Sequence, residues 1–245
     1  MSEFERIVLG SEYKGWFDPR PVTEGAELFS EGSTIVAIGG DLSPERLYDA
    51  YKVGIFPWAS YDTPFFIWHC PKERFVIFPE EIHVSHSMRT LINKGKYKVT
   101  FNKAFREVIT NCSDVDGRIY LEGAWLGEEM IEAYTRLHDL GVAESVEVWN
   151  EDGALVGGLY GVVYNGCFMG ESMFSLEPSG SKLALISLAH KMQAEEGKVI
   201  DCQFPTPHLA SMGGRMIPYQ EFLDMLHPDG RYGFIPVSEV EIQFF

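Results

Sequence analysis

Three consecutive strand-like segments read AESVEVW (residues 143–149), ALVGGLYGVV (154–163) and CFMGESMF (167–174). Their connections contain Asp152-Gly153 and Asn165-Gly166. Both pairs favour tight hairpins, because Asn, Asp and Gly tolerate the positive φ angles that two-residue turns require. The three segments are therefore predicted to form an antiparallel meander.

A helix and a further strand are expected to follow the meander. The helix covers about residues 180–195, and the strand covers Lys198–Phe204, which Pro205 and Pro207 end. Such a strand, helix and strand crossover places the helix on one face of the sheet. A final strand is expected at Val237–Phe245.

Two helices are expected before the meander. The first runs from Ser43 to Tyr51, with Ser43 as its cap, Pro44 at the first helical position and Gly54 as its stop. The second covers residues 127–140 and ends at a glycine. Its apolar residues share one face, namely Met130, Ile131, Tyr134, Leu137 and Leu140.

The composition changes near residue 71. The first 70 or so residues are rich in glycine, proline and aromatic residues, whereas the later pattern is that of an α+β domain. We therefore predict a small mixed N-terminal domain, residues 1–71, and a larger α+β domain, residues 72–245.

The composition also limits the class of protein. The sequence has no apolar run long enough to span a membrane, and its N-terminus does not resemble a signal peptide, so a cytoplasmic protein is expected. The four cysteines form no C-x-x-C pair, which favours reduced thiols over disulfides or a zinc site.

The charge is strongly negative but unevenly spread. A formal charge of −16 argues against broad, nonspecific binding of nucleic acid. Residues 89–106 nevertheless hold six basic residues and no acidic one. This basic island is either a solvated face or a small nucleic-acid footprint.

Two acidic residues lie among apolar, strand-like residues. Glu171 lies within Gly170–Phe174, and Asp201 follows Ile200. A buried carboxylate is costly unless it is paired or hydrogen-bonded, so these acids are either satisfied core residues or the polar floor of a site. With a period of two, Asp201 and Gln203 would share a face, and so would Glu171 and Met173.

Two tryptophans have glycine-flanked, loop-like surroundings. Trp58 lies in GIFPW (54–58) and Trp125 in GAWL (123–126). Exposed tryptophans stack on nucleic-acid bases, although a single tryptophan is more often a core residue. His83 and His86 do not indicate a metal site, because their segment alternates like a strand and would place the two rings on opposite faces.

Taken together, these segments resemble the leucyl/phenylalanyl-tRNA protein transferase family over roughly residues 35–225. The motifs that carry the resemblance are GGDLSP (39–44), GIFPW (54–58), the Trp125 loop, SVEVW (145–149), VGGLYG (156–161), GESMFS (170–175) and IDCQ (200–203).

The resemblance implies an acetyltransferase-like (GNAT-like) C-terminal domain that takes aminoacyl-tRNA instead of acetyl-CoA. Such an enzyme moves leucine or phenylalanine, with methionine a further candidate, onto proteins that begin with Arg or Lys, which creates an N-degron and marks them for degradation. It also implies roles for nine residues: Asp201, Gln203 and Glu171 at the reacting amine, Trp58 and Trp125 at the 3′-terminal adenosine, and Leu159, Phe168, Met173 and Leu188 in an apolar side-chain pocket.

The chemistry implied by the resemblance needs no metal or redox cofactor, because an aminoacyl ester is already activated. We hypothesise that Asp201 accepts a hydrogen bond from Gln203 and thereby fixes the amide whose oxygen receives the amine N–H. A monomer is expected, with the 3′ acceptor ends of Leu-tRNA and Phe-tRNA and the acceptor protein as partners, and no membrane. Two alternatives remain: an acetyl-CoA-dependent GNAT acetyltransferase, and a noncatalytic module that binds N-termini or RNA ends.

Overall fold

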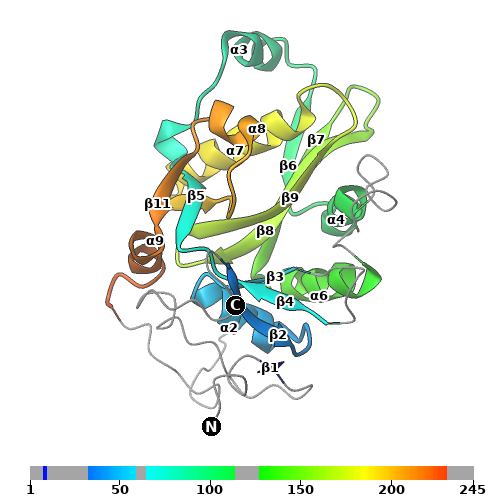
Figure 1. Cartoon of the computed structure of the whole chain (residues 1–245). Coiled ribbons are helices and arrows are strands. Elements are labelled where there is room, and N and C mark those ends of the chain that lie inside the picture. Colours follow the sequence, from blue (N-terminus) through cyan, green and yellow to red (C-terminus); the bar gives the residue numbers. More distant parts are fainter. Residues whose placement is uncertain (1–7, 10–32, 59–64, 114–126, 231–245) are drawn as a thin grey trace.

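The structure is a computed structural model, and it describes residues 8–9, 33–58, 65–113 and 127–230. A seven-stranded sheet, in the order β11-β5-β10-β9-β8-β7-β6, crosses the molecule, and a four-stranded sheet in the order β1-β2-β4-β3 lies below it (Figure 1). Helices pack on both faces of the larger sheet. The predicted α+β class is confirmed.

The larger sheet contains the predicted meander. Its antiparallel part comprises β6 (Lys98–Phe101), β7 (Ala143–Trp149), β8 (Leu155–Tyr164) and β9 (Cys167–Ser175). Strand β10 (Val199–Asp201) then pairs in parallel with β9, as the crossover requires. On its other side, β10 pairs antiparallel with β5 (Glu73–Ile77), and β5 pairs with the edge strand β11 (Arg215–Pro218).

The smaller sheet is built from the first part of the chain. It contains β1 (Val8–Leu9), β2 (Ile35–Gly39), β4 (Ile67–His69) and β3 (Phe56–Trp58). Strands β2, β4 and β3 are antiparallel neighbours, and β1 is parallel to β2.

Two hydrophobic cores lie on the two faces of the larger sheet. One face is covered by α7 (Gly180–Ala194), with α3 (His86–Asn93), α8 (Pro207–Ser211) and the short helix η2 (Pro79–Glu81) nearby. The other is covered by α2 (Pro44–Lys52), α4 (Phe105–Ser113), α6 (Glu128–Asp139) and α9 (Tyr219–Leu226). No helix in these described segments is both long and apolar enough to cross a membrane.

Helix α7 approaches the sheet closely because two glycines meet there. A Cβ atom on Gly157 of β8 would lie 2.6 Å from the Cα of Gly180, the first residue of α7. Real Cβ atoms do not come so near, so the helix can lie this low on β8 only while both positions lack side chains. This contact sets the height of α7 above the sheet.

The expected helices are present, with two differences of detail. Ser43 stands at the N-cap of α2, but its side chain makes no capping hydrogen bond; its backbone N–H donates to Asp41 Oδ1 at 2.9 Å. Leu140 lies just after α6 and is 36 % exposed, so it is not part of the buried face of that helix.

The two hairpin signals have different outcomes. Asn165 and Gly166 have φ angles of 48° and 76°, so the predicted two-residue turn between β8 and β9 is confirmed. Asp152-Gly153 instead belongs to a five-residue loop, residues 150–154, between β7 and β8. Asn150 Oδ1 organises this loop by accepting the N–H groups of residues 152 and 154.

The last expected strands differ in their outcome. Strand β10 ends at Asp201, so the predicted extension to Phe204 is wrong. The segment Val237–Phe245 lies outside the described residues.

Candidate active site

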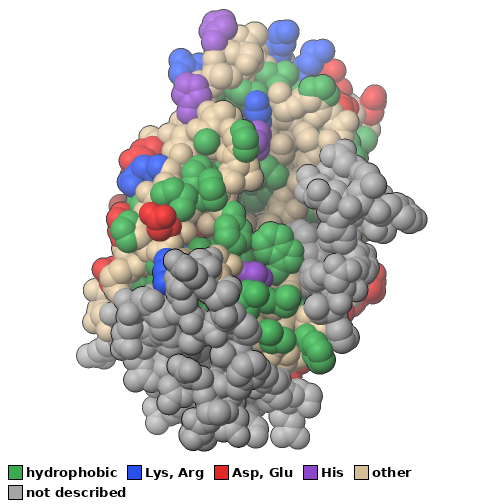
Figure 2. All heavy atoms as spheres, in the orientation of Figure 1, with side chains coloured by type: hydrophobic (Ala, Val, Ile, Leu, Met, Phe, Trp, Pro, Cys, Tyr) green, Lys and Arg blue, Asp and Glu red, His purple; other side chains and the backbone are tan. Residues whose placement is uncertain are grey.

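A cavity of about 630 Å³ opens between β8, β9, β10 and α7, with β3 at its edge. Figure 2 shows hydrophobic side chains gathered around the hollow in the middle of this face. Its floor is apolar, and Glu171, Gln203 and Cys202 supply polar atoms in its wall. An apolar chamber with a few polar groups is the usual form of a small-molecule site.

The four residues predicted for an apolar pocket all line this cavity: Leu159, Phe168, Met173 and Leu188. They can do so because β9 contains a bulge. The register with β8 shifts between the pairs Tyr160↔Ser172 and Gly161↔Gly170, which leaves Glu171 as the extra residue. The bulge reverses the alternation, so Phe168 and Met173 reach the same side of the sheet.

The same bulge overturns the expectation that Glu171 and Met173 share a face. Met173 packs with the core under α7, whereas Glu171 Oε2 accepts a hydrogen bond from the Tyr134 hydroxyl, 3.2 Å away, on the opposite side. The Tyr134 and Tyr51 hydroxyls are themselves hydrogen-bonded to each other. Burial raises the pKa of Glu171 to about 7, although the two tyrosine hydroxyls act to lower it.

Gln203 lies beyond the end of β10 in the left-handed region, with a φ of 57°. Period-two geometry therefore does not apply, and the prediction that Asp201 and Gln203 share a strand face is wrong. The two residues are connected differently: the Gln203 backbone N–H donates to Asp201 Oδ1 at 3.0 Å. The Gln203 side-chain amide donates from Nε2 to Glu171 Oε1 at 3.4 Å, not to Asp201.

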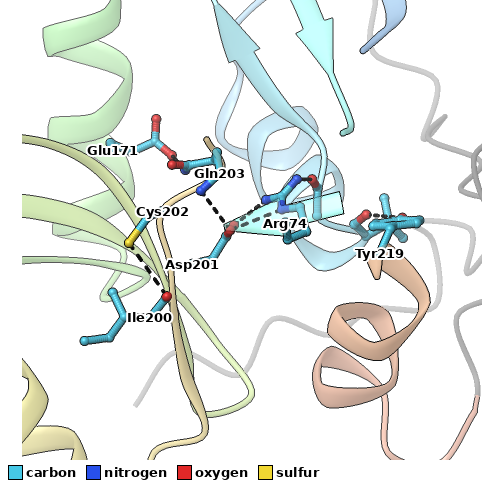
Figure 3. Close-up of polar contacts among 9 residues, drawn as sticks. Arg74, Glu171, Ile200, Asp201, Cys202, Gln203 and Tyr219 are labelled. Atoms are coloured by element: carbon cyan, nitrogen blue, oxygen red, sulfur yellow. Dashed lines mark hydrogen bonds and ion pairs between the residues drawn. The ribbon is translucent and has the colours of Figure 1, made fainter. Parts of the chain in front are cut away.

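Asp201 is paired with an arginine that the sequence reasoning missed. Arg74, on β5, donates from Nε to Asp201 Oδ1 at 3.1 Å and from Nη2 to Oδ2, and its Nη1 donates to the Gly54 carbonyl at 2.7 Å. Figure 3 shows Asp201 between Arg74 and Gln203, with Glu171 on the far side of Gln203. The Arg74 and Asp201 side chains are 1 % and 0 % exposed.

Two aromatic rings lie against the same guanidinium. The rings of Phe56 and Phe222 have their centroids 5.1 and 4.8 Å from Arg74 Cζ. Burial by itself lowers the pKa of Arg74, but the Asp201 carboxylate acts in the opposite direction and the net shift is upward. The sequence contains a signal for Arg74: it is a charged residue at the start of the apolar run RFVIF (74–78). Glu171 shows the same kind of signal, since it also lies in an apolar segment.

Trp58 lies at the edge of the cavity, where it is 41 % exposed. Its ring meets those of His69 and Phe204, with centroids 5.7 and 5.8 Å away. A base could still stack on the exposed part of the indole. Trp125, the second tryptophan implied for adenosine binding, lies outside the described residues.

The residues between 33 and 230 that the structure describes contain no cluster of three or more His, Cys, Asp or Glu side chains suited to a metal ion. The predicted strand-like alternation at His83 and His86 is wrong. Residues 83–85 are irregular and His86 opens α3, so this segment does not alternate as a strand. All four cysteines are free, and burial raises the pKa of the Cys202 thiol in the cavity wall.

The basic island lies on α3, β6, α4 and the segments between them. Part of it borders a second hollow of about 690 Å³, whose wall includes Lys96, Lys98, Lys103 and Trp149. Lys and Arg side chains gather at the upper end of the molecule in Figure 2. At the far end of the island, Arg106 is engaged by Glu128 and Glu132 at 3.1 and 2.7 Å.

Several solved structures are similar to this chain. L-PGS from Bacillus licheniformis has a TM-score of 0.36 and 14 % identity over 72 % of this chain and 57 % of its own. A GCN5-related N-acetyltransferase from Kribbella flavida has a TM-score of 0.35 and 10 % identity over 70 % of this chain and 59 % of its own. This chain thus spans less than two thirds of either structure.

Comparison of sequences identifies the family. The family model described as leucyl/phenylalanyl-tRNA protein transferase matches residues 76–227, and the model of its N-terminal domain matches residues 40–72. A leucyl/phenylalanyl-tRNA protein transferase from Syntrophus aciditrophicus (strain SB) is 50 % identical over 78 % of this chain and 79 % of its own. One from Flavobacterium johnsoniae is 49 % identical over 87 % of this chain and 97 % of its own. The chain belongs to the leucyl/phenylalanyl-tRNA protein transferase family and is an aminoacyltransferase.

Proposed function

We propose that this enzyme moves leucine or phenylalanine, with methionine a further donor that fits the pocket, from aminoacyl-tRNA to the α-amino group of proteins that begin with Arg or Lys. The product would carry an N-degron and be marked for degradation. One observation carries the proposal: the apolar cavity has Gln203 and Glu171 in its wall and Trp58 at its edge.

The apolar floor supports a hydrophobic donor side chain. Leu159, Phe168 and Leu188 are at most 3 % exposed, and Met173 lies beside them in the cavity wall. Full burial of a leucine or phenylalanine side chain contributes roughly 1.5–3 kcal/mol, which is enough to select these donors over polar ones. Leu159 and Leu188 shape the floor of the cavity and would thereby set the order of preference among leucine, phenylalanine and methionine donors.

The polar wall supports aminolysis of the ester. An α-amino group has a pKa of about 7.7–8.0, so a substantial fraction is neutral and nucleophilic near neutral pH. The amine nitrogen would attack the ester carbonyl carbon, and the ribose oxygen would leave and take up the proton that the amine loses. Gln203 Nε2 donates to Glu171. The side-chain oxygen of Gln203, Oε1, is therefore the atom that would accept an N–H of the incoming amine.

The surroundings also favour the proposed partners. The Trp58 indole, with Trp125 as its implied counterpart, would stack on the 3′-terminal adenosine, and the lysines of the basic island would contact phosphates of the acceptor end. The carboxylates of a chain with a formal charge of −16 would attract a basic N-terminal side chain. The proposed enzyme acts as a monomer in the cytoplasm, where aminoacyl-tRNA is made, and uses no metal or redox cofactor.

The division of the chain into residues 1–71 and 72–245 is part of the proposal. It is supported by the change of sheet at this point, because β4 of the smaller sheet ends at His69 and β5 of the larger sheet begins at Glu73.

The test is transfer of radiolabelled Leu and Phe from their tRNAs to a peptide that begins with Arg. An otherwise identical peptide that begins with Ala, and a reaction with labelled acetyl-CoA, serve as controls. We expect label on the Arg peptide alone. Label from acetyl-CoA would instead identify an acetyltransferase, and binding of tRNA without any transfer would identify a noncatalytic module.

A further inference from the structure

We propose that Arg74 is a positioning residue for aminoacyl transfer: through Asp201 it holds Gln203 in its reactive geometry, and through Gly54 it fixes Gln203 relative to the strand that bears Trp58. This inference rests on the proposed function for its chemistry. The three residues Arg74, Asp201 and Gly54 are called the Arg74 clamp below.

The ion pair at the centre of the clamp is not explained by stability alone. Arg74 and Asp201 are almost fully buried, at 1 % and 0 % exposure. Removing two charges from water costs several kcal/mol per ion, and their attraction often does no more than offset that cost. Replacing a buried ion pair by well-packed apolar residues is often neutral or stabilising. A charged pair between the neighbouring strands β5 and β10 therefore calls for another role.

One arm of the clamp reaches Gln203. The Gln203 backbone N–H donates to Asp201 Oδ1 at 3.0 Å, and the Gln203 carbonyl accepts the Phe75 N–H of β5 at 3.2 Å. The Phe204 N–H closes a three-residue turn onto the Cys202 carbonyl at 2.6 Å. A left-handed backbone at a residue with a side chain costs roughly 1–2 kcal/mol, so these contacts are what hold Gln203 in that conformation.

The other arm reaches the edge of the cavity. Arg74 Nη1 binds the carbonyl of Gly54, and the next strand, β3, starts two residues later with Phe56, whose ring packs on the same guanidinium. Trp58 ends β3, and its ring meets that of Phe204, the residue after Gln203. The Arg74 guanidinium therefore connects β3, whose Trp58 is proposed to bind the 3′ adenosine, to Gln203, which is proposed to bind the amine.

This arrangement gives Asp201 a positioning role. Its two carboxylate oxygens accept hydrogen bonds from Arg74 Nε, Arg74 Nη2 and the Gln203 N–H. Asp201 is not among the described residues that line the cavity, and its carboxylate faces Arg74 and the Gln203 N–H. Displacement of a reacting group by about 1 Å can reduce turnover about 100-fold, so the clamp would act on kcat more than on donor binding.

A double-mutant cycle tests the clamp. We expect Arg74→Gln and Asp201→Asn each to lower kcat for transfer to the Arg peptide about 100-fold, because each leaves one buried charge without its partner. The KM for a minimal aminoacyl-adenosine donor should change less than about threefold. In the double variant, the amide oxygen of the introduced asparagine still accepts the Gln203 N–H and no buried charge remains, so kcat should recover at least about tenfold relative to either single variant.

A matched control separates positioning from stability. Arg46 is also buried, at 2 % exposure, and its Nε lies 3.3 Å from Asp41 Oδ1, away from the cavity. Arg46→Gln/Asp41→Asn should lower the melting temperature and leave kcat unchanged, with all assays run well below the lowest melting temperature. If Arg74→Gln also leaves kcat unchanged at that assay temperature, the clamp is only structural and the proposal is overturned. A double variant as inactive as Asp201→Ala would overturn it too, because the Asp201 charge would then be needed in the chemistry.

Hydrogen exchange measures the clamp without any substrate. The Gln203 amide should exchange faster in Arg74→Gln than in the wild type, and at the wild-type rate in the Arg46/Asp41 control. Unchanged exchange in Arg74→Gln would overturn the proposal whatever the activity. Wild-type protein that transfers no aminoacyl group would overturn the proposed function instead, and the exchange experiment would still decide whether Arg74 holds Gln203.

Discussion

At the scale of single residues, Glu171 is the most unusual group in the cavity wall. It is the extra residue of a bulge, it accepts a hydrogen bond from Tyr134, and it holds the side-chain amide of Gln203. A carboxyl group with a pKa of about 7 is partly protonated at neutral pH. Its protonation state therefore decides how firmly the Gln203 amide is held, and it links the site to pH.

The raised pKa of Glu171 also predicts a pH dependence of stability. Between about pH 4.5 and 7 the folded protein keeps a proton that the unfolded chain releases, so this group's contribution to stability is lost as the pH rises through that window. Glu171→Gln cannot titrate. Its free energy of unfolding should therefore rise relative to the wild type between pH 5 and pH 8, by up to about 3 kcal/mol.

Urea unfolding of both proteins at pH 5 and pH 8 measures this difference. Glu177→Gln is the control, because hydrogen bonds from Asn150 and Tyr97 lower the pKa of Glu177, whereas the pKa of Glu171 is raised. The free energy of unfolding of Glu177→Gln should differ from that of the wild type by the same amount at both pH values. A pH-independent difference for Glu171→Gln would show that Glu171 keeps an ordinary pKa.

At the scale of elements, the cavity depends on how α7 is seated on β8. Leu185 and Leu188 on α7 form part of the cavity wall, and Gly180 at the start of the helix touches Gly157 of β8. The bulge in β9 supplies the opposite wall. A small shift of α7 would therefore change the shape of the floor without touching any polar group.

Gly180→Ala should produce such a shift. The added Cβ would lie 2.8 Å from the Val156 carbonyl oxygen and 3.0 Å from Gly157 Cα, and neither backbone atom can move easily. We expect the free energy of unfolding to fall by about 1–3 kcal/mol and the KM for the aminoacyl donor to rise, as measured by urea unfolding and by the transfer assay. Gly127→Ala, where a Cβ meets open space, should change the KM little. Equal effects of the two substitutions on KM would contradict this seating of α7.

At the scale of the whole molecule, the formal charge of −16 opposes nonspecific association with RNA. The basic island is the exception, since it concentrates lysines at one end of the molecule, around the second hollow. Contact with tRNA is therefore expected to be confined to a few phosphates near this end, with the 3′ end reaching the cavity.

Reversing Lys96 and Lys98 to Glu tests this distribution. The KM for aminoacyl-tRNA should rise several-fold, and the dependence of log KM on log salt should become shallower by about one per lysine lost. A minimal aminoacyl-adenosine donor, which has no acceptor stem, should be unaffected. Arg106→Gln is the control, because Arg106 is already engaged by two glutamates and should change the tRNA KM less. Equal effects on tRNA and on the minimal donor would exclude a phosphate contact at these lysines.

The sequence by itself determined the features that depend on near neighbours. Alternation and the Asn165-Gly166 turn predicted the meander, and the 3.6-residue period and flanking glycines predicted α6. The motifs indicated the family, and the family resemblance implied the four apolar residues that line the cavity. The strand, turn and helix signals are readable because each arises within one turn of helix or one strand.

Only the tertiary structure decided how the polar groups meet. Strand β10 stops at Asp201, and β9, which lies between β8 and β10, bulges at Glu171. Arg74 and Asp201 lie 127 residues apart in the chain and meet only because β5 and β10 are adjacent. Local periodicity contains no information on which distant strand becomes a neighbour, so the partner of a buried charge is fixed only when the sheet is assembled.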